Sequence, residues 1–182
     1  MTKQRIALIS LIAIIVFGSL LGGELVYKRV WINDALSQET MQVHGISSAK
    51  MKSIDGKTEL LIQTNQIDDL QKVSQQLQQI AGVNPIRLVD RRTPELVNLF
   101  QSMQFPIQEG IENGNFSQMK LALQELADEA GVDINLTMDN AAIYLTLTRE
   151  EGQLVAVIER HDQGAFLPSV GIDEAASLTQ GK

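Results

Sequence analysis

The stretch that decides the fold reads ISSAKMKSIDGKTELLIQT and occupies residues 46–64. Asp55-Gly56 lies near its centre, and this dipeptide supplies the positive φ angles that a tight hairpin turn requires. On the second arm, Leu60 and Ile62 alternate with polar neighbours, which is the period of a half-buried strand. The stretch therefore predicts an antiparallel pair of strands.

A helix and a third strand are predicted to follow this hairpin. Asp68 and Gln71 are spaced as a helix cap and its reciprocal partner, and Gly82 ends the apolar stripe that follows them. Residues 86–89 have the composition of a short strand. We therefore expect a ββαβ unit within residues 44–92.

The second half of the chain predicts two helices and then three strands. Thr93-Pro94 is typical of a helix start, because the hydroxyl caps the helix and proline needs no amide hydrogen at the first helical position. The apolar face continues past Pro106, which favours a kink over a break. Alternating apolar residues predict three strands within residues 132–160, so residues 93–160 form an ααβββ unit. The fold class is α+β, with both units packed as one domain.

The C-terminal residues lack any periodic pattern. From His161 onward, small and polar residues replace the alternation of the preceding strands. Such composition buries little apolar surface, so residues 161–182 are predicted to be a disordered tail.

The longest apolar run in the chain covers residues 6–23 and contains no charged residue. Its 18 residues would reach about 27 Å as a helix, close to the roughly 30 Å hydrocarbon core of a bilayer. Lys3 and Arg5 precede the run, and no small-x-small cleavage site follows it. We expect residues 1–31 to be a retained membrane anchor rather than a cleaved signal peptide, and residues 32–43 to be a stalk or short helix.

The orientation of this span depends on its short N-terminal flank. Two basic residues lie on each side, so the positive-inside rule is tied. A short basic N-terminus most simply stays in the cytoplasm while the long downstream domain crosses, which places that domain outside the cytoplasm. Gly18 and Gly22 form a G-x-x-x-G pair at which two spans pack closely in some membrane proteins, although the pair also arises by chance.

Charge and cysteine content restrict the partners. Thirteen basic and 22 acidic residues follow the span, so this part of the chain has a formal net charge of −9. Nucleic acids require a surface rich in lysine and arginine, and we expect no nucleic-acid partner. The chain has no cysteine, which excludes disulfides and an acylated lipoprotein cysteine. The partners expected are the bilayer and an envelope protein, with the oligomeric state left open.

No catalytic, metal or cofactor motif is evident. His44 and His161 each lack a second ligand at metal-binding spacing, and no phosphate-binding loop occurs. Catalysis by a cell-wall-directed hydrolase would have to use Asp90, Glu109, Glu112 and His161. Solvated polar side chains are the simpler interpretation, so the protein is expected to be no enzyme and to hold no cofactor.

One candidate ligand site precedes the predicted helix that begins after Thr93. Arg91 and Arg92 stand next to this helix N-terminus, where free amides favour an anion and two guanidinium groups add a fork. The alternative is that the arginines pair locally with Asp90 and Glu95 or are simply solvated. Arg91, Arg92 and Thr93 are therefore the predicted ligand-binding residues.

A second surface of interest is the amide-rich face of the helix predicted after Asp68. Such a face can hydrogen-bond a partner helix, or it can simply be solvated. The glutamines on it are Gln71, Gln75, Gln76, Gln78 and Gln79.

Two sequence blocks carry a resemblance to a group of known proteins. Residues 88–96 read LVDRRTPEL and residues 108–116 read QEGIENGNF. These blocks resemble those of uncharacterised, membrane-anchored envelope proteins of spore-forming Gram-positive bacteria. The resemblance implies a cell-envelope setting and assigns no activity. The ββαβ half is also similar in architecture to small α+β modules that assemble envelope and secretion rings.

The expected function follows from these features together. We expect a single-pass, membrane-anchored extracytoplasmic protein that acts as a binding or assembly module of the cell envelope. The alternatives are a ligand-sensing accessory domain that binds an anion near Arg91 and Arg92, and a cell-wall-directed hydrolase.

Overall fold

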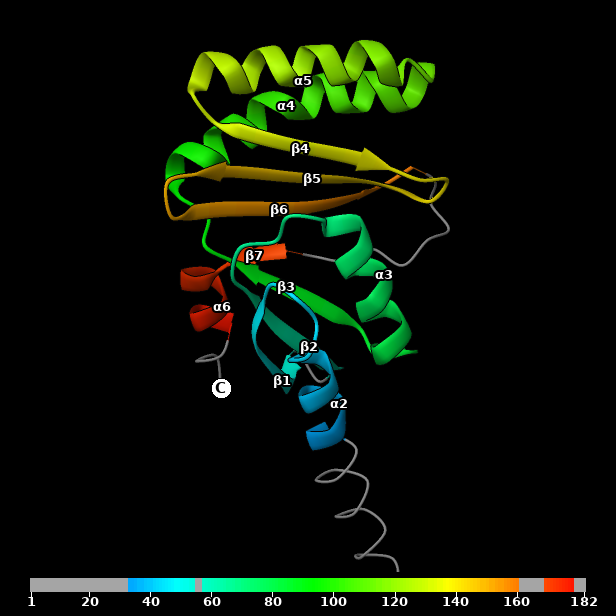
Figure 1. Ribbon diagram of the computed structural model, residues 1–182, viewed down its shortest axis with the longest axis vertical. Helices are drawn as coiled ribbons and strands as arrows, with labels where there is room; N and C mark the ends of the chain where they lie inside the picture. Colours follow the sequence, from blue (N-terminus) through cyan, green and yellow to red (C-terminus); the bar gives the residue numbers. More distant parts are fainter. Residues whose placement is uncertain (1–32, 55–56, 161–168, 179–182) are drawn as a thin grey trace, which may run out of the picture. The chain divides into compact units, whose positions relative to one another are not determined.

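Helices and strands follow one another in the predicted ββαβ and ααβββ order, with additional elements at both ends (Figure 1). The computed structural model describes residues 33–54, 57–160 and 169–178. Residues Ser37–Lys182 form one unit, an α+β domain with two sheets. The elements are α2 (Asn33–Thr40), β1 (Ile46–Ile54), β2 (Lys57–Thr64), α3 (Leu70–Ala81), β3 (Ile86–Asp90), α4 (Pro94–Asn113), α5 (Phe116–Ala130), β4 (Asp133–Met138), β5 (Ala142–Arg149), β6 (Gly152–Glu159), β7 (Ser169–Gly171) and α6 (Ile172–Leu178).

The first sheet is mixed and has the strand order β1-β2-β3-β7. β1 and β2 form the predicted antiparallel hairpin, with Ile54 opposite Lys57 on either side of the turn. The turn residues Asp55 and Gly56 themselves lie outside the described residues. β3 runs parallel to β2, which requires a crossover, and α3 supplies it.

α3 packs on the inner face of this sheet through the predicted apolar stripe. Its buried residues include Leu70, Val73 and Leu77, which join Leu60 of β2 in one core. The N-cap is Asp69 rather than the predicted Asp68, and its carboxylate accepts a hydrogen bond from the Lys72 amide at 3.0 Å. A shift of one residue leaves the same apolar face buried.

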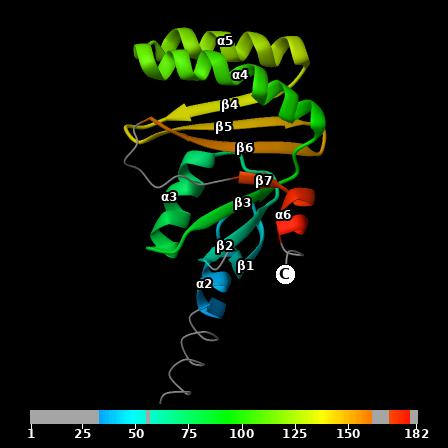
Figure 2. The same ribbon diagram turned by 180° about the vertical axis from the view of Figure 1, so that it is seen from behind.

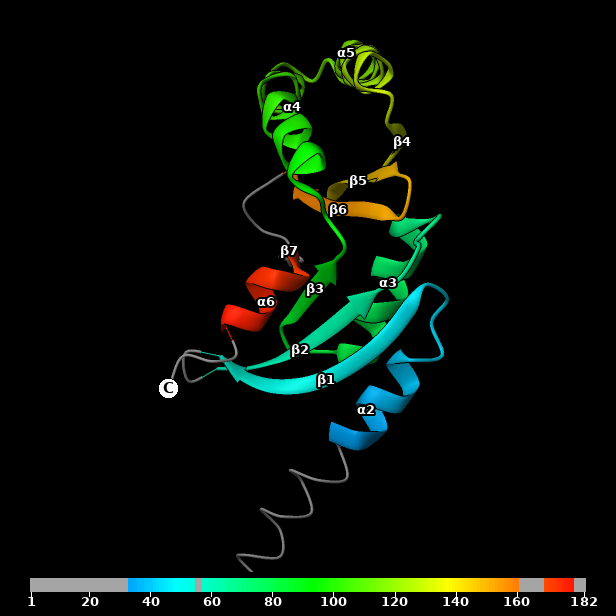
Figure 3. The same ribbon diagram turned by 90° about the vertical axis from the view of Figure 1, so that its left-hand side faces the viewer.

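The second sheet is antiparallel and has the order β4-β5-β6. β5 and β6 are largely buried on both faces, whereas the residues of β4 are exposed or partly buried. Ile143, Leu145 and Leu147 of β5 pack into a core with α4 and α5. Ala142 and Tyr144, which point to the opposite face of β5, belong to the core that contains α3 and β2. The second sheet therefore separates two apolar cores, and Figure 3 shows the helix pair over one face of it.

α4 and α5 form a helical hairpin. α4 continues through Pro106, as the apolar stripe predicted. The two helices approach closely at Gly110, where an added Cβ would lie 2.7 Å from the Cβ of Met119. Only a residue without a side chain fits this contact, so Gly110 sets the separation of the helices at this point.

The prediction of a disordered tail is wrong for residues 169–178. β7 pairs in parallel with β3, placing Val170 opposite Val89, and α6 follows directly. Val170 and Ala175 are buried against Val89, and Figure 2 shows β7 and α6 beside β3. The first sheet thus contains strands from both halves of the chain.

The predicted membrane anchor, including Gly18 and Gly22, falls outside the described residues. Part of the predicted stalk is helical, since α2 begins at Asn33. Within the part of the chain that the structure describes, no helix is long and apolar enough to cross a membrane.

Candidate functional site

Asp90, at the end of β3, is a fully buried carboxylate that connects three strands. Its Oδ1 accepts a hydrogen bond from Arg92 Nε at 2.6 Å, and its Oδ2 accepts one from Arg92 Nη2 at 2.8 Å. Oδ2 also accepts from the backbone amide of Val155 on β6, at 2.9 Å. Arg92 Nη2 in turn donates to Ser169 Oγ on β7, at 3.0 Å. Asp90 and Arg92 therefore join β3, β6 and β7.

The environment of Asp90 explains why it needs these donors. Burial raises the pKa of the Asp90 carboxyl, and hydrogen bonds from Arg92 and from the Val155 amide oppose this rise. A buried carboxylate without partners would be strongly destabilised. The paired guanidinium is thus a structural partner of Asp90.

This pairing changes the predicted anion site. Arg92 binds both carboxylate oxygens of Asp90 through its guanidinium nitrogens. This is the local pairing that the sequence left as an alternative. Arg91 is exposed, and its carbonyl accepts a hydrogen bond from the Gln153 amide at 3.1 Å. The structure brings Arg91, Arg92 and Thr93 to one hollow, where Arg91 is exposed and Arg92 is partly buried against Asp90.

Thr93 acts as the predicted cap of α4. Its Oγ1 accepts a hydrogen bond from the Leu96 amide at 3.4 Å. A hydrogen bond from the Thr93 hydroxyl lowers the pKa of Glu95 in the first turn. The helix N-terminus therefore already has a hydroxyl and a carboxylate beside it.

The hollow next to these residues has a volume of about 560 Å³ and mixed charge. Arg91 and Asn98 line one part of it, whereas Asp173 and Glu174 of α6 line another. Acidic side chains oppose the binding of an anion, so the hollow is less favourable for phosphate than the Arg91-Arg92 dipeptide alone indicates.

The remaining predicted candidates do not share one cleft. Glu109 and Glu112 are both exposed on α4, and Glu109 lines a separate hollow with Gln118. Asp90 is buried next to α6, and His161 lies outside the described residues. No group of three or more potential metal ligands occurs within residues 33–54, 57–160 and 169–178.

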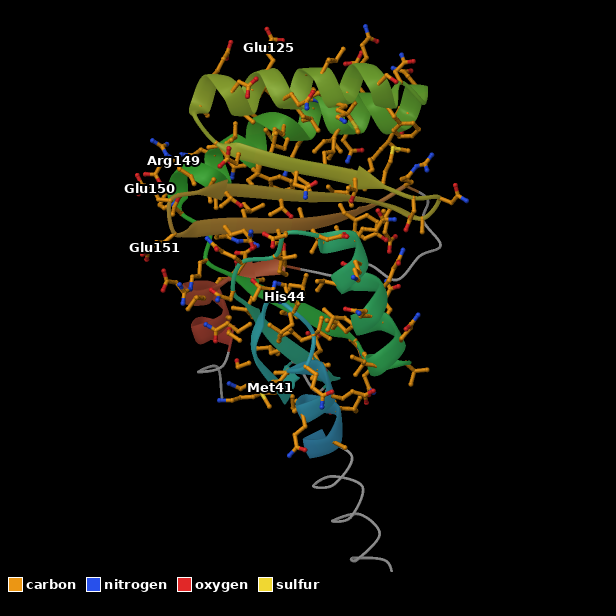
Figure 4. The ribbon with its side chains drawn as sticks, viewed as in Figure 1. Met41, His44, Glu125, Arg149, Glu150 and Glu151 are labelled. Atoms are coloured by element: carbon orange, nitrogen blue, oxygen red, sulfur yellow. The ribbon has the colours of Figure 1, made fainter. Side chains whose placement is uncertain are left out.

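A larger hollow, of about 580 Å³, lies beside α3 and was not predicted as a pocket. We call it the α3 hollow. The exposed lining residues come from the segment before β1, the start of α3 and the amide-rich face of α3. They include His44, which Figure 4 labels, and Asp68, Asp69, Lys72, Gln76 and Gln79. The glutamine pattern was the one sequence signal for this site, because the opposing residues are brought in only by the fold.

The α3 hollow has a polar lining that is open to solvent. Amide and carboxylate side chains surround a base formed in part by the buried Val43 and Val73. Asp68, Asp69 and Lys72 are exposed, so they lack the water-excluded setting in which charged groups act strongly in catalysis. Such a surface suits a polar polypeptide segment that donates hydrogen bonds.

Comparisons with known proteins add no family to this description. No protein-family model matches the chain, and no match was found among the curated proteins or among the solved structures.

Proposed function

We propose that the protein is a single-pass, membrane-anchored module of the cell envelope that binds a protein partner in the α3 hollow and performs no catalysis. The observation that carries this proposal is the α3 hollow, whose hydrogen-bonding side chains are open to solvent. Asp68 and Asp69 favour a partner segment that presents basic and amide side chains. The uncharged run at residues 6–23 supports attachment to the membrane.

The membrane arrangement is tested on the full chain in intact cells. A tag placed after Lys182 should be removed by an added protease while a cytoplasmic control protein stays intact, because the domain lies outside the cytoplasm. A tag that is cleaved only after lysis would refute the proposed sidedness.

The binding surface is tested by introducing a photoreactive amino acid into the full chain. We expect crosslinks to one protein species from position 76 and from position 79, since both side chains line the α3 hollow. A matched probe at Asn140, an exposed residue of the β4–β5 turn, should give none. Equal crosslinking from all three positions, or none from positions 76 and 79, would reject the α3 hollow as the binding site.

The alternative of a ligand-sensing domain depends on the exposed Arg91 beside the second hollow. Arg91→Glu tests it without disturbing the Asp90–Arg92 pair. If this variant and the parent chain bind inorganic phosphate equally or not at all, an anion site at Arg91 is ruled out.

A further inference from the structure

The outer surface of α4 carries an exposed aromatic side chain within an acidic stripe. Phe105 is 88% exposed, and Glu109 and Glu112 follow it at the spacing that places residues on one helix face. The opposite face of α4 buries Met103 and Ile107 in the core. Phe105 therefore projects away from the domain core on a rigid helix.

α5 repeats this arrangement. Leu121 is 66% exposed, and Glu125 and Asp128 follow it at the same spacing, opposite the buried Leu123 and Ala127. Figure 4 shows Glu125 directed away from the sheet that α5 covers. Lys120 is the only basic residue in either helix. We call Phe105, Glu109, Glu112, Leu121, Glu125 and Asp128 the outer helix face.

A surface of opposite charge occurs on the first sheet. Lys50 and Lys52 alternate with Ala49 and Met51, which pack into the core, so the lysines are on the outer side of β1. Leu61 of β2 lies opposite Lys50 and is partly buried. We call Lys50, Lys52, Leu61 and Arg87 the outer sheet face.

The two lysines are available for an external partner. Arg87, the register partner of Leu61 on β3, pairs with Glu59 at 2.8 Å. Within the described part of the chain, no ion pair involves Lys50 or Lys52. Leu61 itself packs against Val89, Val170 and Ala175, the last of which lies on α6, and Lys52 lies opposite Glu59 in the strand register. The outer sheet face therefore offers a partner mainly the net positive charge of its basic side chains.

We propose that copies of this chain associate head to tail, with the outer helix face of one copy docked on the outer sheet face of the next. The two faces are complementary in charge, and the outer helix face places Phe105 and Leu121 among its acidic groups. A twofold contact between two outer helix faces would oppose acidic groups to each other. A contact between two different faces is heterologous, and it closes into a ring or continues as an open chain of subunits.

This inference specifies the assembly role in the proposed function, but it uses surfaces other than the α3 hollow. Attachment to one membrane would raise the local concentration of copies, so a weak contact between domains is sufficient for association. Losing the α3 partner and losing self-association are thus separate outcomes, which different variants distinguish.

The test measures the mass of the full chain in detergent micelles as a function of concentration, by light scattering. We expect the parent chain to associate, and the double substitution Glu109→Lys with Glu125→Lys to weaken association by about tenfold or more, since it opposes like charges. Lys50→Glu with Lys52→Glu should act equally. Mixing these two variants should restore association, because each retains the face that the other has lost.

A matched control reverses two exposed acidic residues elsewhere. Glu150→Lys with Glu151→Lys changes the turn between β5 and β6 (Figure 4), and it should associate as the parent chain does. Unchanged melting temperatures establish that the variants fold. A parent chain that stays monomeric, association that survives both charge reversals, or a mixture that does not recover would each overturn the proposal. Association through Gly18 and Gly22 alone would produce the second of these results.

Discussion

The Asp90–Arg92 pair and the α3 hollow use similar polar side chains in opposite surroundings. Asp90 is fully buried and accepts hydrogen bonds from Arg92 and from the Val155 amide. The carboxylates and glutamines of the α3 hollow are exposed. Arg92, which the sequence marked as part of a ligand site, thus belongs to the buried polar contact between β3, β6 and β7. Gln76 and Gln79, on a helix face that the sequence left as either a partner surface or a solvated one, line the largest of the hollows described above. Burial, which residue type alone does not reveal, separates the two roles.

The largest effect on stability is expected at Asp90. Asp90→Ala should lower the free energy of unfolding by about 3 to 5 kcal/mol, because the change leaves the Arg92 guanidinium and the Val155 amide without their acceptor. Urea unfolding of the full chain in detergent measures the loss. The exposed Asp133 is the control, and Asp133→Ala should stay within about 0.5 kcal/mol of the parent. Similar losses in both variants would mean that burial does not distinguish these carboxylates.

Gln153 is another buried polar residue, and replacing it should cost less stability than replacing Asp90. Its side chain accepts from the Ile67 amide at 2.8 Å and donates to the Ile67 carbonyl at 3.1 Å, which ties β6 to the segment before α3. Gln153→Ala should cost about 1 to 3 kcal/mol of unfolding free energy, since both groups lose their partner in a buried position. The same unfolding measurement on Gln124→Ala, an exposed glutamine of α5, should show almost no change. A loss as small as that of the control would argue that water replaces the side chain.

The sequence predicted the elements that have local signals. Thr93-Pro94 marked the start of α4, and the alternation on β2 gave its buried face, because caps and periodicity act between near neighbours. β7 and α6 were missed because three residues are too few for a period and because their burial depends on β3, far away in the sequence.

At the candidate site, too, the sequence indicated local contacts but not contacts between distant residues. The sequence identified Arg91, Arg92 and Thr93, and it offered Asp90 as a local partner. It gave no indication of the Val155 amide, which donates to Asp90, or of the Ser169 hydroxyl, which accepts a hydrogen bond from Arg92. The pairing of Arg92 with Asp90 is local, but the contacts of these two residues with β6 and β7 depend on the fold and could not be read from residue identity.

The cap of α4 tests a partly buried hydrogen bond close to the Asp90–Arg92 pair. Thr93→Ala should lower the free energy of unfolding by about 1 kcal/mol, because the Leu96 amide loses its acceptor. Thr93→Ser keeps the hydroxyl and should recover most of that stability. If the serine variant is as unstable as the alanine variant, packing of the Thr93 methyl group against Gly152, rather than capping, is the main contribution of this residue.

The smallest change in stability is expected in the α3 hollow, although the effect on binding should be large there. Gln76→Ala combined with Gln79→Ala should alter the free energy of unfolding by no more than about 0.5 kcal/mol, since both side chains are exposed and alanine favours the helix. The same variant should lose the crosslink from a photoreactive residue placed at position 72, which is exposed and lines the α3 hollow. Gln124→Ala, which is far along the chain on α5, should retain it. A stable variant that still crosslinks would show that these amides do not contact the partner, and an unstable one would mean that this surface, like the Asp90–Arg92 pair, serves the fold.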